Sequence, residues 1–290
     1  MTSASFAPGL YVAATPIGHL ADISERARQA LAHCDQLYAE DTRRAQQLLA
    51  ALQISRPKTS IHSLHSHNEA TVKKTVIEAI RRGQSIVLIS DAGTPAISDP
   101  GHEVVDAVWQ AGQAVSPLPG ASAVIASLSV CGFARWPMSF WGFIPAKASA
   151  RRDWLEKIKQ HAGLAVLFEA PHRAQASLAD CGQIFGLHTP MLYAREITKS
   201  HETLFRGSIE NVQAQIAALA EKDPGSAKGE MAWVFDLGDK VEAPQSQADL
   251  HKWAAALAKE MPAASAAKCL SRMLGVSREE AYAALLREIK

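Results

Sequence analysis

Residues 90–101 read SDAGTPAISDPG, and their surroundings indicate an α/β fold. This stretch follows an apolar, β-branched run at residues 86–89, which predicts a buried parallel strand, and it precedes an amphipathic run at residues 102–111, which predicts a helix. Two glycines, two prolines and two aspartates fall within it, and it is longer than an ordinary strand-to-helix connection of about 2–6 residues. Because open α/β sheets bind ligands at the carboxyl ends of their strands, we expect this loop to line a binding site.

Two other loops repeat this layout in the first half of the chain. A predicted strand at residues 9–14 runs into TPIGHL at residues 15–20, and a short strand at residues 114–117 precedes PGASA at residues 119–123. The second of these loops places backbone N–H groups at the start of a helix, where they suit negatively charged atoms. Three such loops at one edge of one sheet predict a binding cleft.

A second set of alternating elements begins after the Gly, Arg, Trp and Pro of residues 132–137. Further strands are expected at residues 139–143, 164–168, 191–194 and 231–236. Two of them end in titratable side chains, EAPHR at residues 169–173 and REITKSHE at residues 195–202, which indicates a functional surface. The helix expected at residues 149–160 is basic and is either a solvated face or an RNA contact.

The length of 290 residues exceeds one typical domain. We expect an N-terminal α/β domain at residues 1–133, a second α/β domain at residues 134–240, and a linker with a helical domain at residues 241–290. Three helices are expected in the last part, at residues 249–260, 264–274 and 278–289, with Gly275 as a stop and Ser277 as a cap. Their layout fits a helix-turn-helix as well as an ordinary helical hairpin.

Composition limits the possible partners. Lys and Arg number 30 against 29 Asp and Glu, so the formal net charge is +1 and any nucleic-acid contact must come from local basic patches. The four cysteines lie far apart without a C-x-x-C pair, which favours a reducing cytoplasm. No apolar run reaches the roughly 18 residues of a membrane span, so we expect no membrane partner.

Several common chemistries lack their motifs. The chain has no G-x-x-x-x-G-K-[ST], no G-x-G-x-x-G and no G-x-S-x-G. His62, His65 and His67 are close in sequence but have no thiolate or carboxylate at metal-ligand spacing, so we expect no metal.

Five motifs in order resemble a known family. They are ATPIG at 14–18, AEDTR at 39–43, SDAGTPAISDPG at 90–101, EAPHR at 169–173 and AREITK at 194–199. Together they resemble a ribosomal-RNA-methylating family of the tetrapyrrole methylase superfamily, in register over residues 9–236, and the tail is similar to that family's C-terminal helical domain. His19 and Ala121 stand where the family more often has asparagine and proline.

The resemblance implies two α/β domains with a cofactor cleft between them and a small C-terminal helical domain. It also implies methyl transfer from S-adenosylmethionine to the ribose 2′-hydroxyl of a cytidine in the decoding region of 16S ribosomal RNA. The small ribosomal subunit would be the substrate partner, and a homodimer in the cytoplasm is expected.

The resemblance and the residue chemistry together name candidate site residues. Cofactor contacts are expected from Thr15, Pro16, Ile17, Gly18, Asp91, Ala92, Gly93, Thr94, Pro95, Ser122 and Ala123, and, by the superfamily's strand ends, from Phe168, Ala194 and Met231. A ribose hydroxyl is a poor nucleophile, so a general base should assist it, and the unranked candidates are Glu196, His172, Glu40 and Asp99. RNA phosphates are expected at Arg43, Arg173, Arg195 and Lys199.

Two other functions remain open on the sequence. A methylase of a small tetrapyrrole-like substrate would share the cofactor cleft but would need a wide apolar trough. A nucleic-acid-binding regulator would use the C-terminal helices and keep a degenerate cleft.

Overall fold

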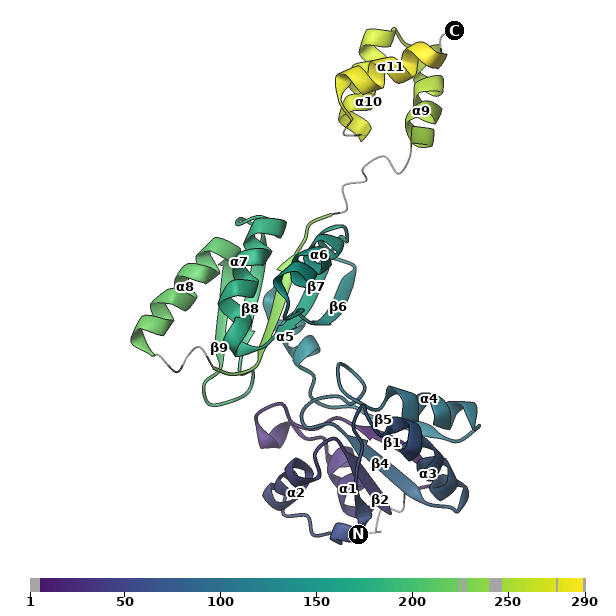
Figure 1. The fold of residues 1–290 in the computed structure, drawn as a ribbon, viewed down its shortest axis with the longest axis vertical. Coiled ribbons are helices and arrows are strands. Elements are labelled where there is room, and N and C mark those ends of the chain that lie inside the picture. The colour runs from purple at the N-terminus through teal and green to yellow at the C-terminus, as the bar shows by residue number, and fades with distance from the viewer. Residues whose placement is uncertain (1–5, 224, 226–227, 240–246, 275, 289–290) are drawn as a thin grey trace. The chain divides into compact units, whose positions relative to one another are not determined.

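The computed structural model describes residues 6–223, 225, 228–239, 247–274 and 276–288. The chain divides into two compact units, Met1–Gly238 and Asp239–Lys290. Gly275, Ile289 and most of the expected linker lie outside the described residues. Figure 1 shows both units and labels their elements where there is room.

The first sheet of the larger unit is entirely parallel. Its strands run in the order β3-β2-β4-β1-β5. They are β1 (Gly9–Ala13), β2 (Gln36–Ala39), β3 (Ile61–Ser63), β4 (Ser85–Ile89) and β5 (Val115–Leu118).

Helices cover both faces of this sheet. They are α1 (Glu25–His33), α2 (Thr42–Ala51), α3 (Glu69–Arg81) and α4 (His102–Gln110). Successive side chains of β4 point to opposite faces of the sheet and enter two apolar cores. Val87 and Ile89 pack with α1 and α2, whereas Ile86 and Leu88 pack with α3 and α4. The two helix pairs lie on opposite sides of the strands in Figure 1. A strand buried on both faces explains the continuous apolar run that precedes residues 90–101.

The second sheet is mixed. Its order is β6-β7-β10-β8-β9, in which β6 pairs with β7 in parallel and the other neighbours are antiparallel. The strands are β6 (Met138–Phe143), β7 (Leu164–Glu169), β8 (Pro190–Arg195), β9 (Thr203–Ser208) and β10 (Met231–Asp236). Edge strand β9 was not expected from the sequence.

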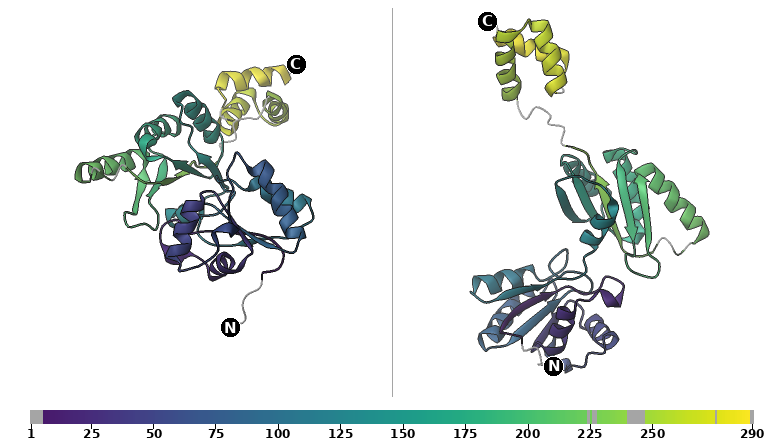
Figure 2. Two further views of the ribbon diagram at one scale, coloured as in Figure 1. Left: turned by 60° about the horizontal axis from the view of Figure 1, so that its bottom comes forward. Right: turned by 180° about the vertical axis from the view of Figure 1, so that it is seen from behind.

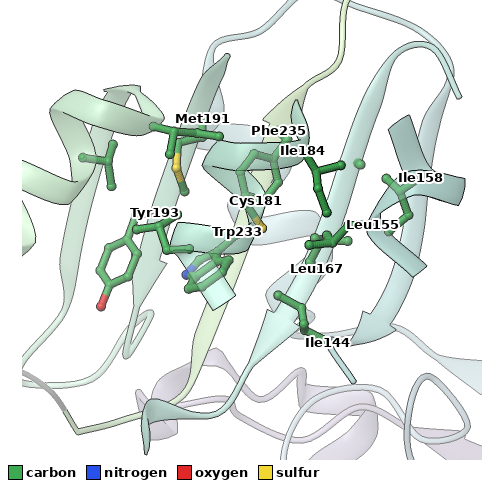
Figure 3. Close-up of a cluster of buried hydrophobic side chains, with 14 of the residues drawn as sticks. Ile144, Leu155, Ile158, Leu167, Cys181, Ile184, Met191, Tyr193, Trp233 and Phe235 are labelled. Atoms are coloured by element: carbon green, nitrogen blue, oxygen red, sulfur yellow. The ribbon is translucent and has the colours of Figure 1, made fainter. Parts of the chain in front are cut away.

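One face of the second sheet carries a large apolar core. The helices on this face are α6 (Ala148–Lys159), α7 (Ala174–Phe185) and α8 (Ile209–Lys222). Trp233 and Phe235 of β10 are fully buried at the centre of the cluster, among aliphatic side chains of these helices (Figure 3). Short 3-10 helices occupy Leu20–Asp22, Lys58–Ser60 and Pro171–Arg173.

Helix α5 (Ala123–Cys131) covers the opposite face of the second sheet. Val124, Leu128 and Cys131 pack against residues of β7, β8 and β10. The helix therefore starts at a loop of the first sheet and contributes its apolar side chains to the second.

The smaller unit consists of α9 (Gln247–Glu260), α10 (Ala263–Leu274) and α11 (Arg278–Glu288). They share an apolar core that includes Ala254, Leu270 and Leu285. Ser277 caps α11: its Oγ accepts from the N–H of Glu280, and the Glu280 carboxylate accepts from the N–H of Ser277. Figure 2 shows these helices in yellow and green from two further directions. Among the described residues, no helix is both long and apolar enough to cross a membrane.

Candidate functional site

The three glycine-containing and proline-containing loops of the first sheet lie together. They leave the carboxyl ends of β4, β1 and β5, which are neighbours in the sheet. The N–H of Thr15 donates to the carbonyl of Gly93 at 2.9 Å, and the N–H of Gly93 donates to the carbonyl of Thr15 at 3.1 Å. Oγ1 of Thr94 donates to the carbonyl of Ala121 at 3.2 Å. Hydrogen bonds thus join all three loops.

The second sheet meets these loops with three strand ends. Met231 pairs with Glu169 of β7 and with Arg195 of β8, so the amino end of β10 lies beside the carboxyl ends of two other strands. This geometry follows from the antiparallel direction of β10. It brings Glu230, just before β10, next to the segment that follows β8.

A cavity of about 150 Å³ lies where the two groups of segments meet. The predicted site residues that line it are Ile17, Ala92, Gly93, Thr94, Asp99, Ser122, Ala123, Phe168, Glu196, Lys199 and Met231. Seven residues absent from the predicted set also line it: Ile97, Ser98, Val124, Phe143, Ile197, Glu230 and Ala232.

Several predicted cofactor contacts lie behind the cavity wall. Thr15, Pro95 and Ala194 are buried, and Ala194 lies inside β8. Asp91 accepts from the N–H of Asp41 at 3.1 Å and forms an ion pair with Arg44 at 3.2 Å. Pro16 and Gly18 flank the lining residue Ile17. The structure therefore gives Asp91 a role in holding the loops together.

Carboxyl groups gather near the first-sheet loops. Burial raises the pKa of Asp99, and the charges of Asp91 and Glu230 add to this, against a hydrogen bond from Ser90. Burial also raises the pKa of Glu40, with Asp91 and Asp99 contributing. Only Asp99 of this pair lines the cavity.

Glu196 belongs to a different electrostatic environment. Burial alone would raise its pKa, but hydrogen bonds from Lys199 and from the N–H of Glu230 outweigh burial and lower it. Nζ of Lys199 lies 2.9 Å from Oε1 of Glu196 and 2.9 Å from Oε2 of Glu230. Lys199 therefore acts as a bridge between two carboxylates, and its charge is already neutralised within the protein.

The loop after β1 contacts the loop after β8 directly. The N–H of His19 donates to Oγ1 of Thr198 at 3.0 Å. A Cβ built on Gly18 would lie 2.6 Å from the same Oγ1 and 2.5 Å from Cγ of Lys199. Gly18 is thus required by a close approach of the two loops.

The structure places His172 away from the other candidate bases. It lines a second cavity of about 620 Å³ beside α7 and α8, whereas Asp99 and Glu196 line the first. The neighbouring Arg173 donates to the fully buried carboxylate of Glu169 at 2.7 Å. This ion pair accounts for the charges that follow β7.

Two arginines are buried, the predicted RNA contact Arg195 and Arg151 of the basic helix expected at residues 149–160. Arg195 is 5% exposed and donates to the carbonyls of Lys228, His201 and Gly225 and to Oγ1 of Thr203. Arg151 on α6 is 6% exposed and forms an ion pair with Asp180 of α7 at 2.6 Å. The expectation that Arg195 reaches RNA is therefore corrected, because its donors hold the chain segments around β8.

Arg43 differs from these two because its side chain is 85% exposed. It forms an ion pair with Asp41 at 2.7 Å near the start of α2, where water can compete for the contact. Among the predicted RNA-contacting residues, Arg43 has the exposed guanidinium.

The cavity combines three kinds of ligand contact. The first N–H groups of α5 have no partner inside the helix, and the side chain of the N-cap residue Ser122 accepts no hydrogen bond from them. Phe168 and Met231 provide apolar surface, and Asp99 provides a carboxylate. The same ligand could therefore present an anionic group, an apolar ring and a cationic centre. The described residues contain no group of three His, Cys, Asp or Glu side chains placed to hold a metal ion.

Comparison with protein families gives one match over most of the chain. The model of the tetrapyrrole (corrin/porphyrin) methylases matches residues 9–213. This range contains both sheets except β10.

Similar sequences extend over almost the whole chain. A protein of Xylella fastidiosa named ribosomal RNA small subunit methyltransferase I is 40% identical over 276 residues, which cover 95% of this chain and 98% of that protein. A protein of the same name from Escherichia coli O157:H7 is 36% identical, with 94% and 93% covered. Among solved structures, diphthine synthase is similar with a TM-score of 0.56 at 14% identity, covering 78% of this chain and 88% of that one.

Proposed function

The chain belongs to the tetrapyrrole methylase family, and on that premise we propose that it transfers methyl from S-adenosylmethionine to the ribose 2′-hydroxyl of a cytidine in the decoding region of 16S ribosomal RNA. Relatives that match nearly its full length carry the name ribosomal RNA small subunit methyltransferase I. The observation that carries the proposal is the cavity, in which loops from three neighbouring parallel strands face Glu196, Lys199 and Glu230.

The residues of the cavity fit S-adenosylmethionine. The N–H groups at the start of α5, which the Ser122 side chain does not cap, suit its carboxylate, and Phe168 and Met231 suit its adenine. Gly93 has a φ of +80°, a conformation that favours glycine, and its backbone lines the cavity between Ala92 and Thr94. We therefore assign the cofactor to the lining residues Ile17, Ala92, Gly93, Thr94, Ser122, Ala123, Phe168 and Met231.

The remaining proposed cofactor residues act through the loops. Thr15, Pro16, Gly18 and Pro95 shape the two loops that meet at the Thr15–Gly93 hydrogen bonds. The Asp91 carboxylate accepts from the N–H of Asp41 and so holds the start of α2 against the loop after β4, and Ala194 lies in the second sheet behind the cavity.

When bound, S-adenosylmethionine supplies an electrophilic methyl group, whose bond to sulfur breaks as the bond to the ribose oxygen forms. The displacement is in line, so a cavity that fixes both partners contributes much of the rate. The 2′-hydroxyl must lose a proton, and a raised pKa improves a carboxylate as a base near neutral pH. Among Glu196, Glu40, His172 and Asp99, only Asp99 both lines the cavity and has a raised pKa. We therefore assign the Asp99 carboxylate as the general base that accepts the proton of the 2′-hydroxyl.

RNA contact is assigned by exposure. The exposed Arg43 suits a phosphate, whereas Lys199 is held by Glu196 and Glu230 and positions them. The substrate is the small ribosomal subunit, the protein is a homodimer, and it works in the cytoplasm. Light scattering of the purified protein tests the dimer: a mass of one chain would contradict it.

The proposed activity is tested with tritiated S-adenosylmethionine and three acceptors: intact small subunits, naked 16S RNA and a tetrapyrrole. Label should enter the RNA of intact subunits. Calorimetry with S-adenosylmethionine alone should give heat of binding at micromolar concentrations. Label in the tetrapyrrole would favour a small-molecule methylase, and absence of binding heat would favour a nucleic-acid-binding regulator; either result overturns the proposal.

A further inference from the structure

Strand β6 contains an irregularity close to the cavity. Its pairing with β7 shifts between Phe140, opposite Val166, and Phe143, opposite Phe168. Three residue steps on β6 therefore match two on β7, which is the pattern of a β-bulge. Gly142 takes φ of +74° within it, a conformation that favours glycine. A bulge of one residue puts Phe140 and Phe143 on the same face of the sheet, which regular alternation would not do.

The bulge directs Phe143 to the cavity. The centroid of its ring lies 5.5 Å from that of Phe168 in an edge-on arrangement, and the ring of Phe140 contacts Phe168 from 4.8 Å. Phe143 lines the cavity, yet 56% of it remains exposed. Core packing does not require an aromatic ring in this position, because more than half of its surface faces solvent.

A second exposed apolar residue lines the same cavity. Ile97 is 47% exposed and stands between Ala96 and Ser98, whose φ values are 64° and 67°. Two non-glycine residues in the left-handed region are costly, and such strain clusters at functional sites. A Cβ built on Gly142 would lie 3.5 Å from Oγ of Ser98, so the bulge and this turn adjoin.

We propose that Phe143 and Ile97 form a clamp for the pyrimidine base of the methylated nucleotide, with the base stacked on the Phe143 ring. The inference rests on the proposed ribose methylation and names how that substrate is positioned. Proteins hold unpaired bases on aromatic faces, and a ribose aligned with Asp99 requires its base to be fixed. Phe168, which supports the Phe143 ring, also lines the proposed cofactor site, so base and cofactor are positioned by one aromatic cluster.

The test compares steady-state kinetics on intact small subunits for Phe143→Ala, Phe143→Leu and Phe143→Trp. Loss of one base-aromatic stack weakens binding roughly 5- to 150-fold, so we expect KM for subunits to rise by that factor in Phe143→Ala and Phe143→Leu. Phe143→Trp should restore it. The affinity for S-adenosylmethionine, measured by calorimetry, should change less than about twofold, since binding without RNA does not use the clamp.

Trp109 provides the matched control, because it is 60% exposed on α4 and does not line the cavity. Trp109→Ala should leave KM unchanged. Suppose that wild-type protein labels subunits. If Phe143→Ala then keeps the wild-type KM, or if Phe143→Leu and Phe143→Trp have the same KM, the clamp is wrong and the proposed activity stands. If wild-type protein labels no RNA, the proposed activity fails and the clamp fails with it.

Discussion

A Cβ added to Gly18 would lie 2.5 Å from Cγ of Lys199, although 181 positions separate the two residues in the chain. Nothing in the backbone of Gly18 demands glycine through a positive φ, so the constraint is the approach itself. The loop after β1 and the loop after β8 therefore close one side of the cavity by direct contact.

Gly18→Ala should separate these two loops. A methyl group at 2.5 Å from Cγ of Lys199 and 2.6 Å from Oγ1 of Thr198 must displace both side chains or the loop itself. This displacement also strains the His19–Thr198 hydrogen bond. We expect the dissociation constant for S-adenosylmethionine to rise about tenfold, since about 1.4 kcal/mol corresponds to that factor. Isothermal calorimetry checks this, and unchanged affinity in a folded variant would show that the contact does not shape the site.

Lys199→Met should change the titration of Glu196. Because Lys199 helps to lower the pKa of Glu196, its loss should raise that pKa, which carbon NMR of labelled glutamate carboxyls can follow. A lowered folded-state pKa stabilises the protein above the ordinary glutamate range and loses this effect as pH falls through the folded value. The variant should therefore be less stable than wild type by about 1–2 kcal/mol at pH 7, with a smaller difference in acid. Lys199→Arg keeps the charge, so its Glu196 pKa and its stability should lie between those of wild type and Lys199→Met. An unchanged Glu196 pKa in Lys199→Met would show that Lys199 does not bridge the two carboxylates.

Asp99→Asn should affect activity and stability in opposite directions. A folded-state pKa raised by burial and by Asp91 and Glu230 favours the protonated fold, so the stabilising effect is present at low pH and is lost as pH rises through the folded value. Removing the charge should therefore raise the melting temperature at pH 7, and this gain should vanish below the usual aspartate range. Turnover should fall about 100-fold or more, while S-adenosylmethionine still binds.

The control for that variant is Asp106→Asn, at an exposed position on α4. It should leave both turnover and melting temperature unchanged. Wild-type turnover in Asp99→Asn would remove Asp99 from the proton-accepting role.

Arg195 and Arg43 should separate stability from RNA binding. Arg195→Lys cannot reproduce the donors that bind four residues in two chain segments, so the free energy of unfolding should fall by about 2–4 kcal/mol in urea titrations. Arg43→Ala should leave the free energy of unfolding unchanged, because water competes for its exposed ion pair. The same variant should bind small subunits more weakly, with a salt dependence about one unit shallower. If Arg195→Lys weakened only subunit binding and Arg43→Ala lowered only stability, the structural role of Arg195 and the RNA contact of Arg43 would both be wrong.

The sequence predicted the loops of the first sheet because parallel strands carry an unambiguous signal. The apolar run at residues 86–89 and the glycine and proline content of residues 90–101 placed Ala92, Thr94 and Asp99 at one edge, where the structure has them. Regular βαβ alternation fixes the direction of every strand, so each following loop falls on the same side.

The second sheet could not be predicted to the same depth. Strand β9 alternates in burial and carries Thr, Arg and Ser, so it has no continuous apolar run. The antiparallel direction of β10 puts Glu230 at the site through the start of a strand, which a search of carboxyl ends misses. Phe143 reaches the cavity through a bulge, and a two-residue period would assign it to the opposite face.

Charge alone also misled the prediction of RNA contacts. Arg195 ends β8 and Arg173 follows β7, positions where surface residues are common, yet both bind groups inside the protein. Their partners come from residues 201, 225 and 228 and from Glu169, and only the three-dimensional pairing reveals them.

The most direct test of the account is to locate the transferred methyl group on the RNA. Intact small subunits labelled with tritiated methyl are digested with alkali, which cleaves RNA wherever the 2′-hydroxyl is free. We predict label in a single alkali-resistant dinucleotide that begins with a cytidine of the decoding region. Label released as an ordinary mononucleotide, which would place the methyl group on a base, would contradict it.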